Sequence, residues 1–239
     1  RQPFFVLEFV DGTSLRDLMR TYPEGKCDTQ TVLRTGMDVC SALHCAHSQG
    51  VLHGDVKPED ILITQEGTAK LMDFGLAKML GEPGVMQEGT MIVCTVTYLA
   101  PEVALRKGAD ARSDLYSLGA VLYEMVTGKP PFPGEDPVRV IFSHIHDYPV
   151  SPSKLNSKVP QALADCIMKL LEKEPEKRYQ TTADVLKTLR EISEEFLRKV
   201  LVVPYEPTVV PAPRPLAARE VLLIDRVEEM GLLREAVDR

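Results

Sequence analysis

The feature that most constrains the fold is a charged stretch at residues 53–75. Three carboxylates and one lysine lie in two short turns of this stretch: Asp55, Lys57, Asp60 and Asp73. Between the turns, two short apolar runs surround Gly67, a pattern that predicts a tight β-hairpin. A hairpin of this length returns the chain to its starting end, so we expect Asp60 and Asp73 to lie close together.

The residue types at this hairpin end suit metal-assisted chemistry on a phosphate. Two neighbouring carboxylates, Asp60 and Asp73, form a natural site for a divalent cation, because Mg²⁺ prefers hard oxygen ligands. Asp55 is free to accept a proton from a hydroxyl group. Lys57 can neutralise a phosphate as it moves.

Five segments of the chain, in the expected order, resemble the motifs of eukaryotic-type protein kinases. They are residues 53–60 (HGDVKPED), 73–75 (DFG), 94–102 (CTVTYLAPE), 114–119 (DLYSLG) and 174–179 (EPEKRY). The resemblance covers residues 1 to about 200. It implies an α+β, mainly α-helical fold, which is a kinase-like large lobe with a small β-hairpin at the active site.

The resemblance also implies a role for each residue at the hairpin end. Asp55 would be the catalytic base, and Lys57 would contact the transferred phosphate. Asp60 and Asp73 would hold Mg²⁺, or Mn²⁺ in its place. Thr95 would hydrogen-bond near Asp55 and Lys57. A lysine two residues after the base, together with this threonine, is the serine/threonine pattern and not the tyrosine pattern.

Further contacts follow from the same resemblance. Asp114 would accept backbone N–H bonds from the catalytic loop, since a buried carboxylate needs such partners. His53 and Phe74 would pack together and set the active arrangement. Arg178 would form a buried or nearly buried ion pair with Glu102.

The start of the chain is expected to bind the nucleotide. Residues 4–10 form an apolar run that predicts a buried strand. By resemblance this run is the last small-lobe strand and hinge, with the backbone of Glu8 and Val10 bonding the adenine edge of ATP. Leu62 and Lys57 would complete the nucleotide contacts.

Two departures from the family pattern bear on the chemistry of the site. Gly54 stands where the family usually has arginine, and Asp60 stands where it has asparagine. The first change removes the cation that normally grips a phosphorylated activation loop, so we expect activity to be independent of phosphate on Thr90, Thr95 or Thr97. The second change keeps an oxygen ligand and adds a negative charge.

Apolar periodicity and capping residues predict the helices. The expected ranges are 13–22, 29–48, 110–127, 136–146, 160–171 and 182–199, with Gly128 ending the third and Thr181 or Thr182 capping the last. His44 and His47 lie on the second helix. Because no further metal ligand is evident near them, we assign both to structural or surface roles.

Composition narrows the class of protein. The 239 residues have room for one large domain, and the net charge of −7 argues against nucleic acid or an anionic membrane as partner. The five cysteines show neither metal-ligand spacing nor an even disulfide framework. They fit a reducing compartment, so we expect a cytoplasmic protein. No apolar run approaches the roughly 20 residues of a membrane span.

The chain is expected to divide into four parts. Residues 1–12 would be the end of the small lobe and the hinge, and 13–200 the large lobe. Residues 201–217 would be a proline-rich linker, and 218–239 a stray helix or the start of a further domain. Residues 223–230 faintly resemble the entry segment of P-loop regulatory ATPase domains, and an ordinary amphipathic helix is the alternative. Because no glycine-rich loop or small-lobe lysine is present, we expect a longer natural chain.

Three functions remain open at this point. The leading one is a serine/threonine protein kinase that transfers the γ-phosphate of ATP to a protein hydroxyl. Gly54 and Asp60 motivate a pseudokinase scaffold as the alternative. A small-molecule phosphotransferase of the antibiotic-kinase type shares the His-Gly-Asp loop, but Lys57, Thr95 and the 94–102 segment argue against it.

Overall fold

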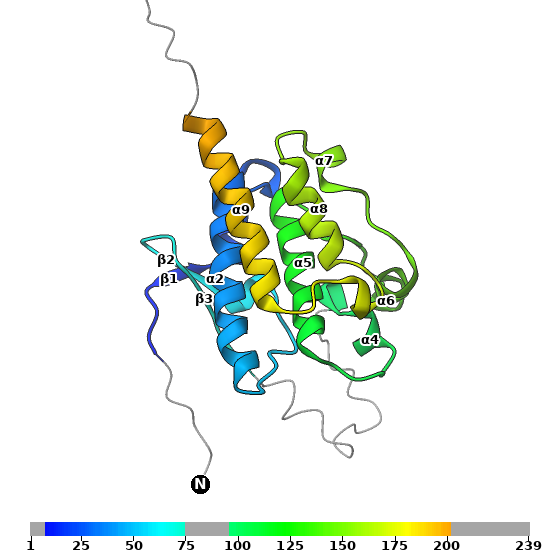
Figure 1. Cartoon of the computed structure of the whole chain (residues 1–239). Helices are drawn as coiled ribbons and strands as arrows, with labels where there is room; N and C mark the ends of the chain where they lie inside the picture. The colour runs from blue at the N-terminus through cyan, green and yellow to red at the C-terminus, as the bar shows by residue number, and fades with distance from the viewer. Residues whose placement is uncertain (1–7, 75–95, 202–239) are drawn as a thin grey trace, which may run out of the picture. The chain divides into compact units, whose positions relative to one another are not determined.

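The computed structural model describes residues 8–74 and 96–201 (Figure 1). The three strands are β1 (Gly12–Ser14), β2 (Ile61–Thr64) and β3 (Ala69–Leu71). The α-helices are α1 (Leu15–Thr21), α2 (Thr29–Ser48), α4 (Pro101–Ala104), α5 (Ala111–Thr127), α6 (Pro137–His146), α7 (Pro152–Leu155), α8 (Gln161–Leu170) and α9 (Thr182–Leu201). Short 3₁₀ turns are η1 (Pro23–Gly25), η2 (Pro58–Asp60), η3 (Val96–Tyr98) and η4 (Pro175–Lys177). The mainly helical α+β class predicted from the sequence is confirmed.

The predicted hairpin is present and belongs to a three-stranded antiparallel sheet. The order is β1-β2-β3, with Ile61 opposite Leu71 in the hairpin. Gly67 turns the chain with a φ of 78°, a left-handed conformation that glycine adopts at little cost. Strand β1 was not predicted, and it brings Gly12 so close that a Cβ there would lie 2.4 Å from Ile63 O. Glycine is therefore required at this edge of the sheet.

Helix α2 begins and ends where the periodicity predicted. Asp28 caps its first turn, because the Asp28 side chain accepts a hydrogen bond from Thr31 N at 2.9 Å. The helix lies beside α9 and α5 and against β3, as Figure 1 shows. It therefore links the sheet that ends at the charged turns to the helical core.

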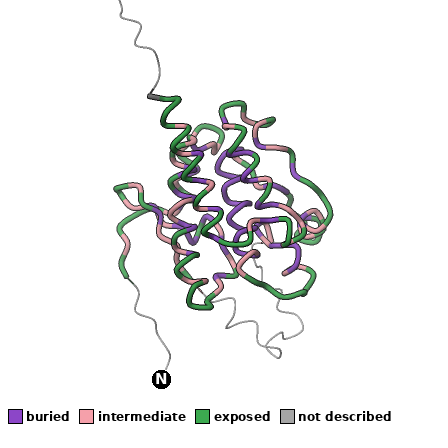
Figure 2. Tube along the Cα trace, viewed as in Figure 1, coloured by how far each residue is buried: buried purple, intermediate pink, exposed green. Residues whose placement is uncertain are grey.

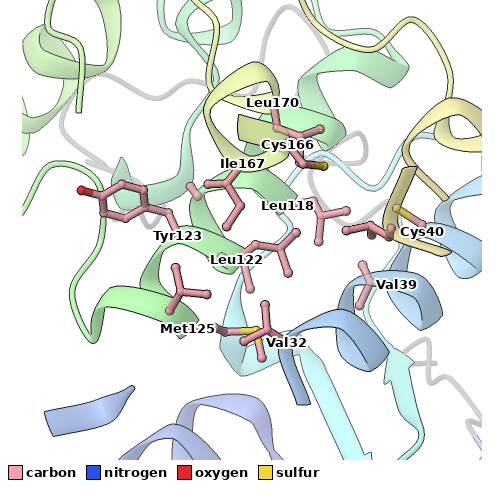
Figure 3. Close-up of a cluster of buried hydrophobic side chains, with 14 of the residues drawn as sticks. Val32, Val39, Cys40, Leu118, Leu122, Tyr123, Met125, Cys166, Ile167 and Leu170 are labelled. Atoms are coloured by element: carbon pink, nitrogen blue, oxygen red, sulfur yellow. The ribbon is translucent and has the colours of Figure 1, made fainter. Parts of the chain in front are cut away.

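Helix α5 is the centre of the core. Asp110 and Ser113 form a capping box at its start, and Gly128 ends it in the left-handed conformation. Every residue from 113 to 127 is buried, which explains why its apolar residues cover more than one face (Figure 2). Figure 3 shows its side chains between α2 and α8: Val32, Val39 and Cys40 on one side and Cys166, Ile167 and Leu170 on the other, around Leu118, Leu122 and Met125. Each large buried side chain stabilises the fold by about 1.5–3 kcal/mol.

The prediction of a buried strand at the start of the chain is wrong for its described part. Residues 8–10 form no strand, and the Phe9 side chain is 89% exposed. A strand is held by hydrogen bonds to a neighbouring strand, and within 8–74 and 96–201 no strand pairs with these residues. Two short helices, α4 and α7, were not predicted, because four residues are too few to show a helical period.

Several predicted features lie outside the described residues. They include residues 4–7 of the first run, Thr90, Cys94 and Thr95, the proline-rich linker and the helix expected at 218–239. Of the five cysteines, Cys27, Cys40, Cys45 and Cys166 are free thiols, and all but Cys45 are buried. Among the described helices, none combines the length and hydropathy needed to cross a lipid bilayer.

Candidate active site

The catalytic loop, residues 53–60, runs from the end of α2 into β2 and brings three of the predicted residues together. Lys57 Nζ lies 2.5 Å from Asp55 Oδ2 and 3.3 Å from Asp60 Oδ2. Asp60 and Lys57 are largely buried, whereas Asp55 is about one third exposed. The proposed base, the proposed phosphate contact and a proposed metal ligand therefore form one cluster.

The backbone connects Asp73 to this cluster. Met72 N donates a hydrogen bond of 2.8 Å to Asp60 O, which continues the hairpin pairing by one step. The next residue, Asp73, is exposed and has a φ of 59°, in the left-handed region that non-glycine residues seldom adopt. The two turns thus meet at the open end of the hairpin, as the sequence predicted.

Asp114, in the first turn of α5, holds the start of the catalytic loop. Its Oδ2 accepts a hydrogen bond from His53 N at 3.0 Å, and its Oδ1 accepts one from Gly54 N at 2.8 Å. His47 Nε2 lies 2.7 Å from the same Oδ2. The predicted role of Asp114 is confirmed, and His47 has the structural role assigned to it. His44 also has a structural contact, with Thr182 Oγ1 at 3.1 Å.

His53 and Phe74 pack as predicted. Their ring centroids lie 4.9 Å apart in an edge-to-face arrangement. His53 Nε2 is 2.7 Å from Met72 O, and because a carbonyl can only accept, this nitrogen carries the proton. The contact connects the catalytic loop to the turn that carries Asp73.

The cluster shifts the proton affinities of two members. Burial alone would lower the pKa of Lys57, but its hydrogen bond with Asp55 and the nearby charges of Asp55 and Asp60 raise it above its ordinary value. Burial raises the pKa of Asp60, and the charge of Lys57 offsets this only in part. Lys57 therefore stays charged, and burial disfavours the ionised form of Asp60, an effect that the charge of Lys57 partly offsets.

A divalent metal fits this site only when a bound ligand, such as a phosphate, supplies further coordinating oxygen atoms. Within the described residues, no group of three or more His, Cys, Asp or Glu could hold a metal ion. Mg²⁺ is commonly bound by one or two carboxylates, waters and substrate phosphates. Asp60 and Asp73 match that pattern by residue type and by their common position at the hairpin end.

The predicted ion pair between Glu102 and Arg178 is confirmed and buried. Arg178 Nη1 and Nη2 donate to the two oxygens of Glu102 at 2.8 and 2.7 Å, and Ser113 Oγ donates to Glu102 Oε1 at 2.6 Å. Burial raises the pKa of Glu102, but the bonds from Arg178 and Ser113 lower it below its ordinary value overall. Breaking one side of a buried pair costs about 3–5 kcal/mol, so this pair fixes the segment before α5 to η4.

The nucleotide contacts remain predictions. Leu62 is half-buried in β2, opposite Lys70 in β3 and Ser14 in β1. Val10 is half-buried, and the exposed Glu8 side chain pairs with Lys70 Nζ at 2.5 Å. Thr95, the remaining predicted catalytic residue, lies outside the described part of the chain.

One charged contact of the catalytic loop is not signalled by any sequence pattern. Arg16 in α1 donates from Nε to Glu59 Oε1 at 2.8 Å. The two residues are 43 positions apart. No local pattern signals such a contact, because periodicity and short motifs report only on neighbours in sequence.

Comparison with known proteins identifies relatives of the chain. The family model described as "Protein kinase domain" matches residues 1–189. The serine/threonine-protein kinase PknB of Mycobacterium leprae is 40% identical over 183 residues, which are 77% of this chain and 29% of that protein. PknB of Mycolicibacterium smegmatis is 40% identical over 193 residues, 80% of this chain and 31% of the relative. A probable serine/threonine-protein kinase of Clostridium perfringens is 40% identical over 192 residues, 80% of this chain and 28% of the relative. The chain thus spans less than a third of the length of each of these relatives.

Proposed function

The chain belongs to the protein kinase domain family, and on this premise we propose that the full-length protein transfers the γ-phosphate of ATP to serine or threonine hydroxyls of proteins. The observation that carries the proposal is the cluster of Asp55, Lys57 and Asp60, with Asp73 on the adjoining turn. These are the residue types that phosphoryl transfer needs, and the start of the loop that bears Asp55, Lys57 and Asp60 is held by hydrogen bonds to Asp114.

Each residue of the cluster has a role that its chemistry supports. Asp55 is exposed enough to meet a hydroxyl group and accepts its proton. Lys57 supplies a fixed positive charge for the phosphate. Asp60 and Asp73 would hold Mg²⁺ or Mn²⁺, which neutralises phosphate charge when bound.

Substrate class and surroundings are part of the proposal. Lys57 two residues after the base, together with Thr95, favours serine and threonine over tyrosine, and the relatives named above are described as serine/threonine kinases. The free thiols fit a reducing compartment that also supplies ATP, so we place the reaction in the cytoplasm. Residues 218–239 are proposed as the start of a further, regulatory domain or as a separate helix.

The test is transfer of labelled γ-phosphate by the full-length protein to a general protein acceptor such as casein, with Mg²⁺ or Mn²⁺. Acid hydrolysis of the product identifies the modified amino acid. We expect phosphoserine or phosphothreonine from the wild type and a large loss in Asp55→Asn and Asp73→Asn. Equal rates in all three proteins would favour a scaffold, and transfer to an aminoglycoside but not to protein would favour a small-molecule phosphotransferase.

A further inference from the structure

Arg16 is the centre of a charged cluster that joins three distant segments. Its Nε donates to Glu59 Oε1 at 2.8 Å, and its Nη1 donates to Glu124 Oε1 at 2.6 Å. Its Nη2 donates to the hydroxyl of Tyr98, which in turn donates to Glu124 Oε2 at 2.5 Å. One guanidinium thus contacts the catalytic loop, the η3 turn and helix α5.

The positions of Glu59 and Glu124 in the chain indicate what the cluster does. Glu59 lies in η2 between Lys57 and Asp60, so a shift of Glu59 shifts both. Glu124 lies in α5, ten residues after Asp114 and therefore about 15 Å further along the helix. Helix α5 consequently holds the catalytic loop at both ends, directly through Asp114 at the start and through Arg16 at Glu59.

The chemistry of arginine suits this bridge. Its guanidinium presents five donors in a rigid fork, so it can reach Glu59, Glu124 and the tyrosine hydroxyl at once, which a lysine ammonium on a flexible stem cannot do with the same geometry. The Arg16 side chain is 23% exposed and that of Glu124 only 8%. Charge-assisted hydrogen bonds are stronger where water is largely excluded, so Glu124 fixes Arg16 firmly. Arg16 in turn bonds Glu59, whose side chain is 45% exposed.

We propose that Arg16 is a positioning residue, which sets the place of Lys57 and Asp60 by tying Glu59 to helix α5 and Tyr98. The inference rests on the proposed phosphotransfer for its effect on rate. Its structural part, the tether of the loop, is independent of any activity.

Two substitutions in the full-length protein test the tether, each with a matched control. Glu59→Ala removes the loop end of the bridge and leaves the partly buried Arg16–Glu124 pair intact, so folding should survive. Its control is Glu66→Ala, an exposed glutamate in the turn of the same hairpin. Arg16→Lys keeps the positive charge but loses the forked array of N–H donors. Its control is Arg20→Lys, which alters an exposed arginine of α1 whose ion-pair partner among the described residues is Asp17.

Two readouts are measured on all four variants. Steady-state transfer to casein should show kcat lowered by roughly 10- to 100-fold in Glu59→Ala and Arg16→Lys with the KM for ATP unchanged, because misplacement of reacting groups slows the step without removing binding contacts. Amide hydrogen exchange should become faster in residues 53–60 and remain at the wild-type rate in α5. Both control variants should match the wild type in both readouts.

The outcomes separate the two proposals. Wild-type kcat and wild-type exchange in Glu59→Ala would overturn the positioning role while leaving the kinase function intact. If the wild type itself transfers no phosphate, the proposed function fails, and hydrogen exchange of the loop still decides whether Arg16 tethers it. If Arg16→Lys does not fold, Glu59→Ala decides alone.

Discussion

At the scale of single residues, Gly54 shows how a departure from a family pattern can agree with the backbone. Its φ is 81°, which disfavours side chains, and its N–H bonds Asp114 Oδ1 at 2.8 Å. Glycine therefore fits the loop without strain. It also leaves no cation before Asp55 to bind a phosphorylated loop.

The first residue-scale prediction follows from that missing cation. Phosphatase treatment of the full-length protein should leave its phosphate-transfer rate unchanged. Position 54 has no arginine that could bind a phosphate on Thr90, Thr95 or Thr97. The measurement compares the rate before and after treatment. A large loss of activity that an acidic substitution at Thr90 restores would refute this expectation.

The second residue-scale prediction concerns Asp114. Asp114→Asn removes a buried negative charge and replaces one of the two carboxylate oxygens with an NH₂ group, which cannot accept a hydrogen bond. At most one of the two loop N–H groups then keeps its acceptor. We expect a destabilisation of about 2–3 kcal/mol and slower transfer. Denaturant unfolding followed by circular dichroism measures the first, since the chain has no Trp.

Asp38→Asn is the matched control for Asp114. Asp38 Oδ2 accepts a single backbone bond, from Ala69 N at 2.9 Å, at the far end of the hairpin from Asp55. It should lose some stability and keep the catalytic rate of the folded protein. Similar rate losses in both variants would show that Asp114 has no special link to the loop.

At the scale of elements, sequence patterns predicted the long helices well and the short elements poorly. The starts and ends of α2 and α5 follow from Asp28, Asp110 and Gly128, whose capping chemistry is local. Strand β1 forms because it pairs with the distant strand β2, and no local pattern encodes such pairing. Residues 8–10 have no such partner strand within the described residues. The strand prediction for residues 8–10 failed for that reason.

The element-scale prediction compares two helix glycines. A Cβ at Gly119 would lie 2.6 Å from Leu170 Cβ, whereas the atoms nearest to a Cβ at Gly36 would be Cδ atoms of Leu189 and Leu122, at 3.1 and 3.3 Å. Gly119→Ala should therefore force α8 away from α5 and cost about 2 kcal/mol. Gly36→Ala should cost less than about 1 kcal/mol, because side-chain ends yield and alanine favours the helix.

Unfolding of both alanine variants by denaturant measures this difference in packing. A smaller loss of stability in Gly119→Ala than in Gly36→Ala would mean that α5 and α8 are packed too loosely for a Cβ at position 119 to clash with Leu170.

At the scale of the whole molecule, buried polar contacts bind the functional segments to the core. His144 of α6 is fully buried, with Nδ1 at 2.7 Å from the Tyr116 hydroxyl and Nε2 at 2.9 Å from Thr97 O. Burial and the nearby charge of Lys173 lower the pKa of His144 to about 4. His144 is therefore neutral in the folded protein and becomes charged on unfolding below its ordinary pKa.

This pKa shift predicts how stability depends on pH. Between the unfolded pKa of about 6.5 and the folded value, the unfolded chain binds the extra proton, so the free energy of unfolding falls as pH falls. From pH 7 to pH 5 we expect His144 to account for a loss of about 2 kcal/mol. The loss of unfolding free energy between pH 7 and pH 5 should be smaller by that amount in His144→Gln. It should equal the wild-type loss in His146→Gln, which alters an exposed histidine. Equal losses in all three proteins would contradict the role of His144.

The candidate site was predicted from sequence where its chemistry lies in short motifs. Asp55, Lys57, Asp60 and Asp73 occur within 19 residues, and a hairpin is enough to bring them together. The Arg16 bridge spans 43 and 108 positions to its carboxylates and depends on how α1 packs in the finished fold. Such contacts follow from tertiary structure, so the sequence alone could not reveal them.

In the proposed reaction, Asp55 takes a proton from a protein hydroxyl at a site shared with Lys57, Asp60 and Asp73. The most direct measurement is single-turnover transfer of γ-phosphate by the full-length protein, compared among wild type, Asp55→Asn and the exposed-site control Asp165→Asn. We expect Asp55→Asn to bind ATP with unchanged affinity and to transfer phosphate about 10²- to 10⁴-fold more slowly, and Asp165→Asn to keep the wild-type rate. Transfer at the wild-type rate by Asp55→Asn would contradict it.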